Sequence, residues 1–146
     1  MIVKKMDVVI SEAELGQWVL PLVQKQEKVK DVVIRCGSGT LEVDGTIALQ
    51  FDIPVQTKWR VSPLEGQRVA VTLVAVSTSF FGLGGEMLRV ALMKALANFL
   101  PAIDDVQIIQ DALIVNVGAR IKRYGIVAER DFSALTVEPG TLRIEL

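Results

Sequence analysis

The chain contains no histidine and a single cysteine, Cys36. Without histidine there can be no Ser-His-Asp or Cys-His nucleophile and no His-ligated metal site. One cysteine excludes a disulfide within the chain, so we expect Cys36 to be a buried, inert thiol. The G-x-S-x-G and P-loop patterns are absent as well. The sequence therefore indicates no catalytic residues, no metal and no cofactor, and we expect a protein that is not an enzyme.

Aromatic residues are few, at 5%, and neither sign of charge dominates, with 16 Lys+Arg against 17 Asp+Glu. A net charge of −1 gives no reason to expect nucleic-acid binding. No uncharged apolar run reaches the ~18 residues that a membrane-spanning helix needs. No secretory signal is visible at the start of the chain, and this absence alone favours a cytoplasmic location.

Aliphatic side chains are present in excess. The residues AVILMFWYC make up 51% of the chain and the mean hydropathy is +0.42, whereas an ordinary soluble domain has about 45–50% with glycine included. A length of 146 residues suits one domain, residues 1–146. The apolar surplus must therefore lie in a large core, a cavity, a subunit interface or a membrane.

The first predicted element is a helix that begins after Ser11. Ser11 and Glu14 have the spacing of a capping box, and apolar residues follow at helical intervals up to residue 23. We expect Pro21 to kink or shorten this helix, because proline lacks an N–H and clashes with the preceding turn. The polar stretch 24–28 should end it.

Strands are predicted from residue 29 onward. Residues 29–36 alternate, and between 41 and 61 the odd positions are almost all apolar while the even positions are polar. We interpret 41–61 as one long curved strand with a bend or bulge at Gly45. A two-residue hairpin turn at Asp44-Gly45 would mix the two faces, so we exclude it. Pro54 marks a second break or an edge position.

Two further segments are strongly apolar. After a turn at 62–66, residues 68–77 form a strand that is apolar on both faces, so we expect it to be covered on both sides. The helix 86–100 has four polar residues in one narrow stripe, so we expect it to be buried on most of its circumference. It is too short to span a bilayer, and Pro101 ends it.

Two hairpins are predicted in the last third of the chain. A turn at Gln110-Asp111 places apolar residues opposite one another across 106–115. Pro139-Gly140 suits a type II turn within 135–146, and that turn pairs Val137 with Leu142.

Three weaker signals have an ordinary structural reading that we favour. The glycines of 82–85 could cradle a phosphate at a helix start, but a connector is more common. Asp104-Asp105 could bind a cation, but a solvated turn is more common. The basic residues Arg120, Lys122 and Arg123 could touch an anionic membrane surface, or lie in a solvated loop.

The order of these elements resembles that of the tubular lipid-binding (TULIP) superfamily, in particular its small single-domain bacterial members. The stretches that carry the resemblance are 10–15, 39–45, 106–117 and 140–144. The resemblance implies a highly curved antiparallel sheet along a helix and an apolar interior that takes acyl chains. It also implies that copies pair into longer tubes.

We therefore predict an α+β fold, with a long, strongly curved antiparallel sheet wrapped around one apolar helix, plus an N-terminal helix. The first functional hypothesis is non-enzymatic binding or carriage of a lipid or other hydrophobic ligand. The alternative is an interaction module that uses its apolar surplus to form a homo-oligomer, most simply a dimer, without ligand. The helix 86–100 would then be a groove wall or a subunit seam, unless it is only a core helix. The predicted ligand contacts are Phe51, Trp59, Phe80, Phe81, Leu83, Met87, Leu88, Leu92, Met93, Leu96 and Phe99.

Overall fold

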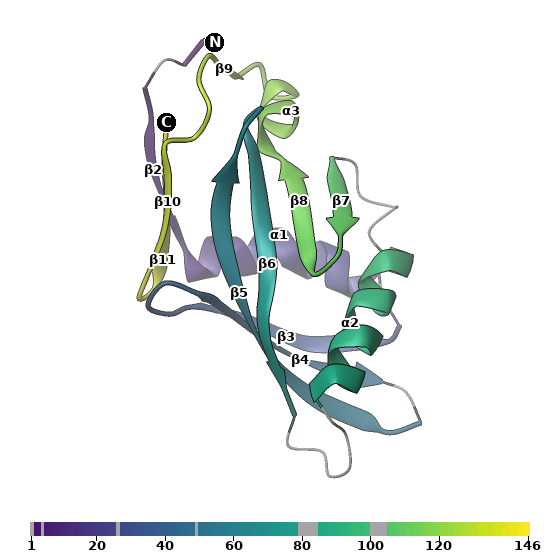
Figure 1. Ribbon diagram of the computed structural model, residues 1–146. Helices are drawn as coiled ribbons and strands as arrows, with labels where there is room; N and C mark the ends of the chain where they lie inside the picture. Colours follow the sequence, from purple (N-terminus) through teal and green to yellow (C-terminus); the bar gives the residue numbers. More distant parts are fainter. Residues whose placement is uncertain (1, 4, 26, 49, 79–84, 100–104) are drawn as a thin grey trace.

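A computed structural model describes the chain except for residues 1, 4, 26, 49, 79–84 and 100–104. The described residues form an α+β fold built on a large six-stranded antiparallel sheet (Figure 1), as predicted. In sheet order its strands are β3 (Val29–Cys36), β4 (Leu41–Ala48), β5 (Asp52–Leu64), β6 (Arg68–Ser77), β8 (Ala112–Asn116) and β7 (Val106–Ile109).

A smaller three-stranded sheet joins the two ends of the chain. It pairs β10 (Ala134–Glu138) with β11 (Thr141–Glu145), and β11 with β2 (Asp7–Ser11). Two short strands, β1 (Ile2–Val3) and β9 (Val127–Ala128), pair in parallel nearby, and a short helix α3 (Val117–Lys122) follows β8.

Both predicted hairpins are confirmed. Ile108 lies opposite Leu113 across the Gln110-Asp111 turn, and Val137 lies opposite Leu142. Gly140 has a φ of 85°, which the third position of a type II turn requires and which glycine adopts without strain.

The helix α1 (Glu12–Gln24) begins with the predicted capping box. The Ser11 hydroxyl accepts the Glu14 N–H at 3.2 Å, and the Glu14 carboxylate accepts the Ser11 N–H at 3.4 Å. These two bonds satisfy N–H groups that a helix start leaves without a partner. Pro21 does not end the helix, which continues for three more residues to the polar stretch.

The prediction of one strand over 41–61 is wrong, because β4 and β5 are two strands of a hairpin. Leu41 lies opposite Trp59 and Ile47 opposite Ile53. In this register every odd residue faces an odd residue, so the apolar alternation runs through the connection at 49–51 without interruption. A connection with an odd number of residues therefore leaves the period-two alternation unchanged and cannot be detected from it. The two-residue turn that we excluded would have interrupted the alternation.

Gly45 lies inside β4, opposite Val55, and is not in a turn. The irregularity lies in the neighbouring strand, where the β3 register shifts between Lys30 and Val33. A Cβ on Gly45 would lie 3.4 Å from the Val32 side chain, so the glycine gives this bulge room. Pro54 lies in the part of β5 that extends beyond β6, which is the edge position that proline tolerates.

The strand β6 differs from its prediction in two respects. The turn before it occupies residues 65–67, because β5 continues to Leu64. Leu73 is buried, but Val74 is 40% exposed, so the second face of β6 is not covered near its end. Although β6 has apolar residues on both faces, other parts of the protein do not cover both faces along its whole length.

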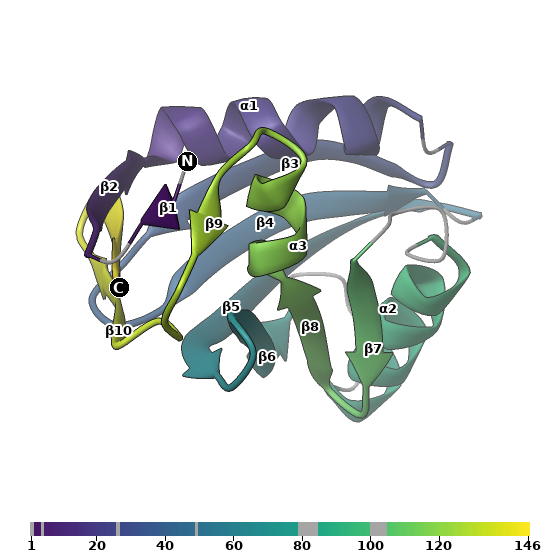
Figure 2. The same ribbon diagram turned by 90° about the horizontal axis from the view of Figure 1, so that it is seen from above.

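The helix α2 (Gly85–Phe99) has the predicted extent but not the predicted burial. Of its described side chains only Leu88 is buried, at 4% exposure, while Met87 and Val90 are 65% and 62% exposed. The helix lies beside one end of the sheet (Figures 1 and 2). Its residue Leu88 packs on Ile53 and Val55. The expectation that most of its circumference is buried is therefore wrong.

The described apolar residues form two separate core clusters. One joins the three-stranded sheet to the β3–β4 turn through Ile10, Cys36, Val137 and Leu142. The other is the contact of Leu88 with β5. Among the described residues no large side chain is less than 2% exposed. The apolar surplus is therefore spread over partly covered surfaces instead of one dense core.

Candidate functional site

The helix α1 lies lengthwise against β3 (Figure 2). Between them is a hollow of about 390 Å³ with a mostly apolar lining, which we call the α1–β3 hollow. Its lining residues are Gly16, Val19, Leu20, Val23, Gln24, Val29, Lys30, Asp31, Val32 and Ile34.

Two sequence periods bring these residues together. Gly16, Val19 and Val23 are three and four residues apart, so they share one face of α1. On β3, Ile34 lies opposite Val43 and Val29 opposite Ile47, so both belong to the apolar face of the sheet. Because Leu88 packs on that same face through Ile53, α1 and α2 cover two different parts of one apolar surface.

Gly16 is the notable residue of this lining. A Cβ placed on Gly16 would have no other atom within 4 Å, apart from its own helix and chain neighbours. Glycine in the middle of a helix destabilises it by roughly 0.5–1 kcal/mol relative to alanine. Gly16 therefore weakens α1, and it stands at the position where a larger side chain would begin to fill the hollow.

The two ends of the hollow differ in polarity. At the end formed by the last turn of α1 and the start of β3 are Gln24, Lys30 and Asp31, all exposed. Lys30 Nζ contacts Asp52 Oδ2 at 2.7 Å, and this hydrogen bond and charge raise the pKa of Lys30 above its ordinary value. At the other end are Gly16 and Ile34, close to the first core cluster.

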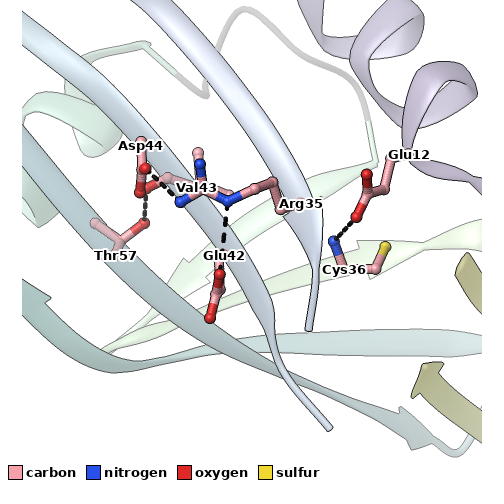
Figure 3. Close-up of polar contacts among 7 residues, drawn as sticks. All are labelled: Glu12, Arg35, Cys36, Glu42, Val43, Asp44 and Thr57. Carbon is pink, nitrogen blue, oxygen red and sulfur yellow. Dashed lines mark hydrogen bonds and ion pairs between the residues drawn. The ribbon is translucent and has the colours of Figure 1, made fainter. Parts of the chain in front are cut away.

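Cys36 lies where α1 and β3 meet at this apolar end. Its backbone N–H donates to Glu12 Oε1 at 2.7 Å (Figure 3), which ties the first turn of α1 to the end of β3. Burial, and secondarily the Glu12 charge, raise the pKa of the Cys36 thiol. A buried thiol with a raised pKa is a poor nucleophile, as expected from the sequence.

The opposite face of β3 and β4 is polar. Arg35 contacts Asp44 at 2.5 Å and Glu42 at 3.6 Å, and these carboxylates raise its pKa (Figure 3). Exposed pairs of this kind stabilise a fold little. They mark the solvent side of the sheet, whereas α1 and α2 lie on its apolar face.

Those predicted ligand contacts that the structure describes do not line the α1–β3 hollow. Phe51 is 62% exposed, whereas Trp59 is buried and donates its Nε1–H to Thr57 Oγ1 at 2.7 Å. Leu92, Met93 and Leu96 are half-buried on α2, beside exposed Met87 and buried Leu88. Phe80, Phe81 and Leu83, and the side chain of Phe99, lie outside the described part of the chain.

Met93 lines a second, more open groove of about 630 Å³ between α2 and the end of β6. Its central cation, Arg89, donates to the Leu73 and Val74 carbonyls at 3.1 and 3.2 Å and to Asp111 at 3.2 Å. These bonds attach α2 to β6 and to the β7–β8 turn. The guanidinium thus has a structural role.

The structure adds little to the three weaker predictions, which were a phosphate cradle at 82–85, a cation site at Asp104-Asp105 and a membrane contact through 120–123. Residues 82–84 and Asp104 lie outside the described part of the chain. Arg123 contacts Asp105 at 2.8 Å, while Arg120 and Lys122 lie on exposed positions of α3. A membrane contact through these residues stays a prediction.

Among the described residues, no three His, Cys, Asp or Glu side chains are grouped so that they could hold a metal ion. No described helix combines the length and apolarity that a membrane span requires. No family model, curated protein or solved structure matches the chain.

Sequence reasoning missed the hollow because its aliphatic residues have the spacing of an ordinary core. The signal that could have revealed it is Gly16, a glycine in a helix that is otherwise well capped and periodic.

Proposed function

We propose that this chain binds or carries a lipid or another hydrophobic molecule, without catalysis, and that the α1–β3 hollow holds the ligand. The observation that carries the proposal is the empty space above Gly16 in an apolar hollow of about 390 Å³. Small-molecule sites are typically concave, mostly apolar and about 300–1,000 Å³ in volume.

The distribution of apolar side chains supports the same proposal. A chain with 51% apolar residues has, in its described part, no large side chain below 2% exposure. Covering such surface with a ligand yields about 25 cal/mol for each Å² removed from water. A bound hydrophobic molecule would therefore supply burial that the protein alone lacks.

We also propose that the large sheet curves around the apolar helix α2. On the same apolar face α2 buries Leu88 and holds Leu92, Met93 and Leu96 half-buried. The resemblance to the tubular lipid-binding superfamily adds the same expectation of an acyl-chain site between helix and sheet.

A second candidate function is self-association through α2. The exposure of Met87, Val90 and Val74, at 65%, 62% and 40%, favours it, because contiguous exposed aliphatic residues often mark an interface. A dimer that depends on this surface should become monomeric in Val90→Asp, measured by light scattering. A wild-type protein that is already monomeric at high concentration would exclude it.

The ligand-binding proposal is tested by filling the hollow. We expect wild-type protein to take up a fluorescent fatty acid and Gly16→Leu to lose uptake, because the leucine side chain enters the space of the ligand. Ala13→Leu is the matched control, since Ala13 is an exposed residue of the same helix outside the lining.

Circular dichroism of both variants verifies that α1 is intact. Extraction of protein purified from its own host, followed by mass spectrometry, should also release a lipid. Absence of any extracted lipid together with no uptake by wild-type protein would contradict the proposal.

A further inference from the structure

We infer that the exposed side of α2 binds a second copy of this chain, and that the two α2 helices pack antiparallel about a two-fold axis at Val90. This inference rests on the second candidate function, self-association through α2. It deepens that function by naming the partner helix, its direction and its register.

The exposed side of α2 is largely apolar. Leu88 is buried against the sheet, whereas Met87 and Val90 are 65% and 62% exposed. Val74 of β6 is 40% exposed and lines the same groove as Val90, so it extends this surface. In both views α2 lies at the periphery of the molecule, where a partner can reach it (Figures 1 and 2). The exposed side chains of the helix are Glu86, Met87, Val90, Ala91, Lys94, Ala97 and Asn98.

The two charges on this side point to a second copy as the partner. Glu86 lies four residues before Val90 and Lys94 lies four residues after it, and both are exposed. If two α2 helices run antiparallel and cross at Val90, Glu86 of each copy lies opposite Lys94 of the partner subunit. A two-fold dimer requires a surface that is complementary to itself, and this arrangement supplies one.

The same charges exclude the other ways of pairing two α2 helices. In a parallel two-fold pair each residue faces its own copy, so Glu86 would meet a glutamate and Lys94 a lysine, and like charges repel. An antiparallel pair centred elsewhere loses both ion pairs, because only Val90 is equidistant from the two charges.

The helix has the length and the free carboxylate that this register needs. An overlap centred on Val90 uses residues 85–95, which extend about 15 Å, or about three turns. The Glu86 side chain is 87% exposed, and its contact with Arg89 Nε is 3.8 Å long, so its carboxylate remains accessible to a partner.

Charge reversal tests the register. Glu86→Lys places a lysine opposite a lysine at both ends of the overlap, so the dimer Kd measured by analytical ultracentrifugation should rise about tenfold. Lys94→Glu should have the same effect through paired glutamates. In a 1:1 mixture of the two variants, native mass spectrometry should show a preference for the mixed dimer, because each lysine then faces a glutamate.

The matched control is Glu65→Lys, which makes the same change of net charge. Glu65 is exposed in the turn between β5 and β6, at the far end of β6 from α2. This variant should keep the wild-type Kd, and its mixture with Lys94→Glu should show no preference for the mixed dimer. Circular dichroism verifies that every variant is folded.

Cross-linking tests the direction of the helices. Axes about 8–10 Å apart leave facing Cα atoms roughly 4–5 Å apart, which is within disulfide reach. Val90→Cys should therefore form an intermolecular disulfide under mild oxidation. Asn98→Cys should not, because it lies about 24 Å along the axis from its copy in the antiparallel pair. Cys36 is buried, so it contributes little background.

The outcomes separate this inference from the function on which it rests. A wild-type protein that is monomeric at its highest soluble concentration contradicts both, as does a dimer that Val90→Asp leaves intact. A dimer that Val90→Asp dissociates but charge reversal does not weaken overturns the register alone. Cross-linking of both cysteine variants would show a parallel pair and overturn the direction.

Discussion

Truncation of Leu88 to alanine tests how α2 is attached to the fold. Leu88 is 4% exposed and packs on Ile53 and Val55, which are 7% and 3% exposed. Removing a buried leucine side chain costs about 2–5 kcal/mol, from lost transfer energy and the cavity that remains. We expect the lower half of that range, because α2 is covered on one side only and can settle.

The assay is urea denaturation followed by circular dichroism, with a thermal scan beside it. A loss of about 2–3 kcal/mol corresponds to a fall in Tm of roughly 5–10 °C for a chain of this size. The matched control is Met87→Ala, the preceding residue, whose side chain is 65% exposed. Its effect should remain within about 0.5 kcal/mol.

Equal losses from the two substitutions would refute this account of α2. They would mean either that Met87 is covered in solution or that Leu88 is not. If both were large, the exposed side of α2 would be an interface, and the self-association hypothesis would gain. If both were negligible, α2 would contribute nothing to global stability.

Three further predictions concern other parts of the fold. Gly118→Ala should destabilise by about 1–3 kcal/mol in denaturant titration, because its Cβ would lie 2.9 Å from Gln67 Cβ; an unchanged midpoint would show that the turn moves aside freely. Ser11→Ala should cost about 1 kcal/mol through loss of the α1 cap, and Ser11→Asp should restore most of it; equal stability of the two variants would refute the capping role. Cys36 should react with iodoacetamide more slowly than an unfolded cysteine at pH 9, because burial and Glu12 raise its pKa and reduce the thiolate fraction; equal rates in buffer and in urea would contradict that shift.

Local chemistry was predictable from the sequence wherever a few neighbouring residues decide the outcome. The capping box at Ser11 and the turns at Gln110 and Gly140 each depend on contacts within about four residues. The α+β class and the large antiparallel sheet followed from the change of period at Val29. Register was predictable in the two hairpins with two-residue turns. A turn of even length pairs odd-numbered with even-numbered residues, so only one turn position aligns the apolar side chains.

Burial was not predictable, because composition shows which residues are apolar and not which of them a neighbour covers. The helix α2 was expected inside the sheet, yet Met87 and Val90 face solvent. The β4–β5 connection at 49–51 was missed because its odd length leaves the alternation unchanged. The α1–β3 hollow depends on the distance between a helix and a strand, which neither period specifies.

The pairing of β2 with β11 has a consequence for synthesis of the chain. Within the described part of the chain, residues 7–11 pair in a sheet only with residues 141–145. At a ribosomal rate of about 5–20 residues per second, the earlier strand waits on the order of 10 s for its neighbour to emerge. During that interval an aliphatic segment, Val8-Val9-Ile10, has no sheet to join. Chaperones that recognise short extended aliphatic stretches should therefore bind residues 8–10 early in synthesis. They should release this segment only after β11 has been made.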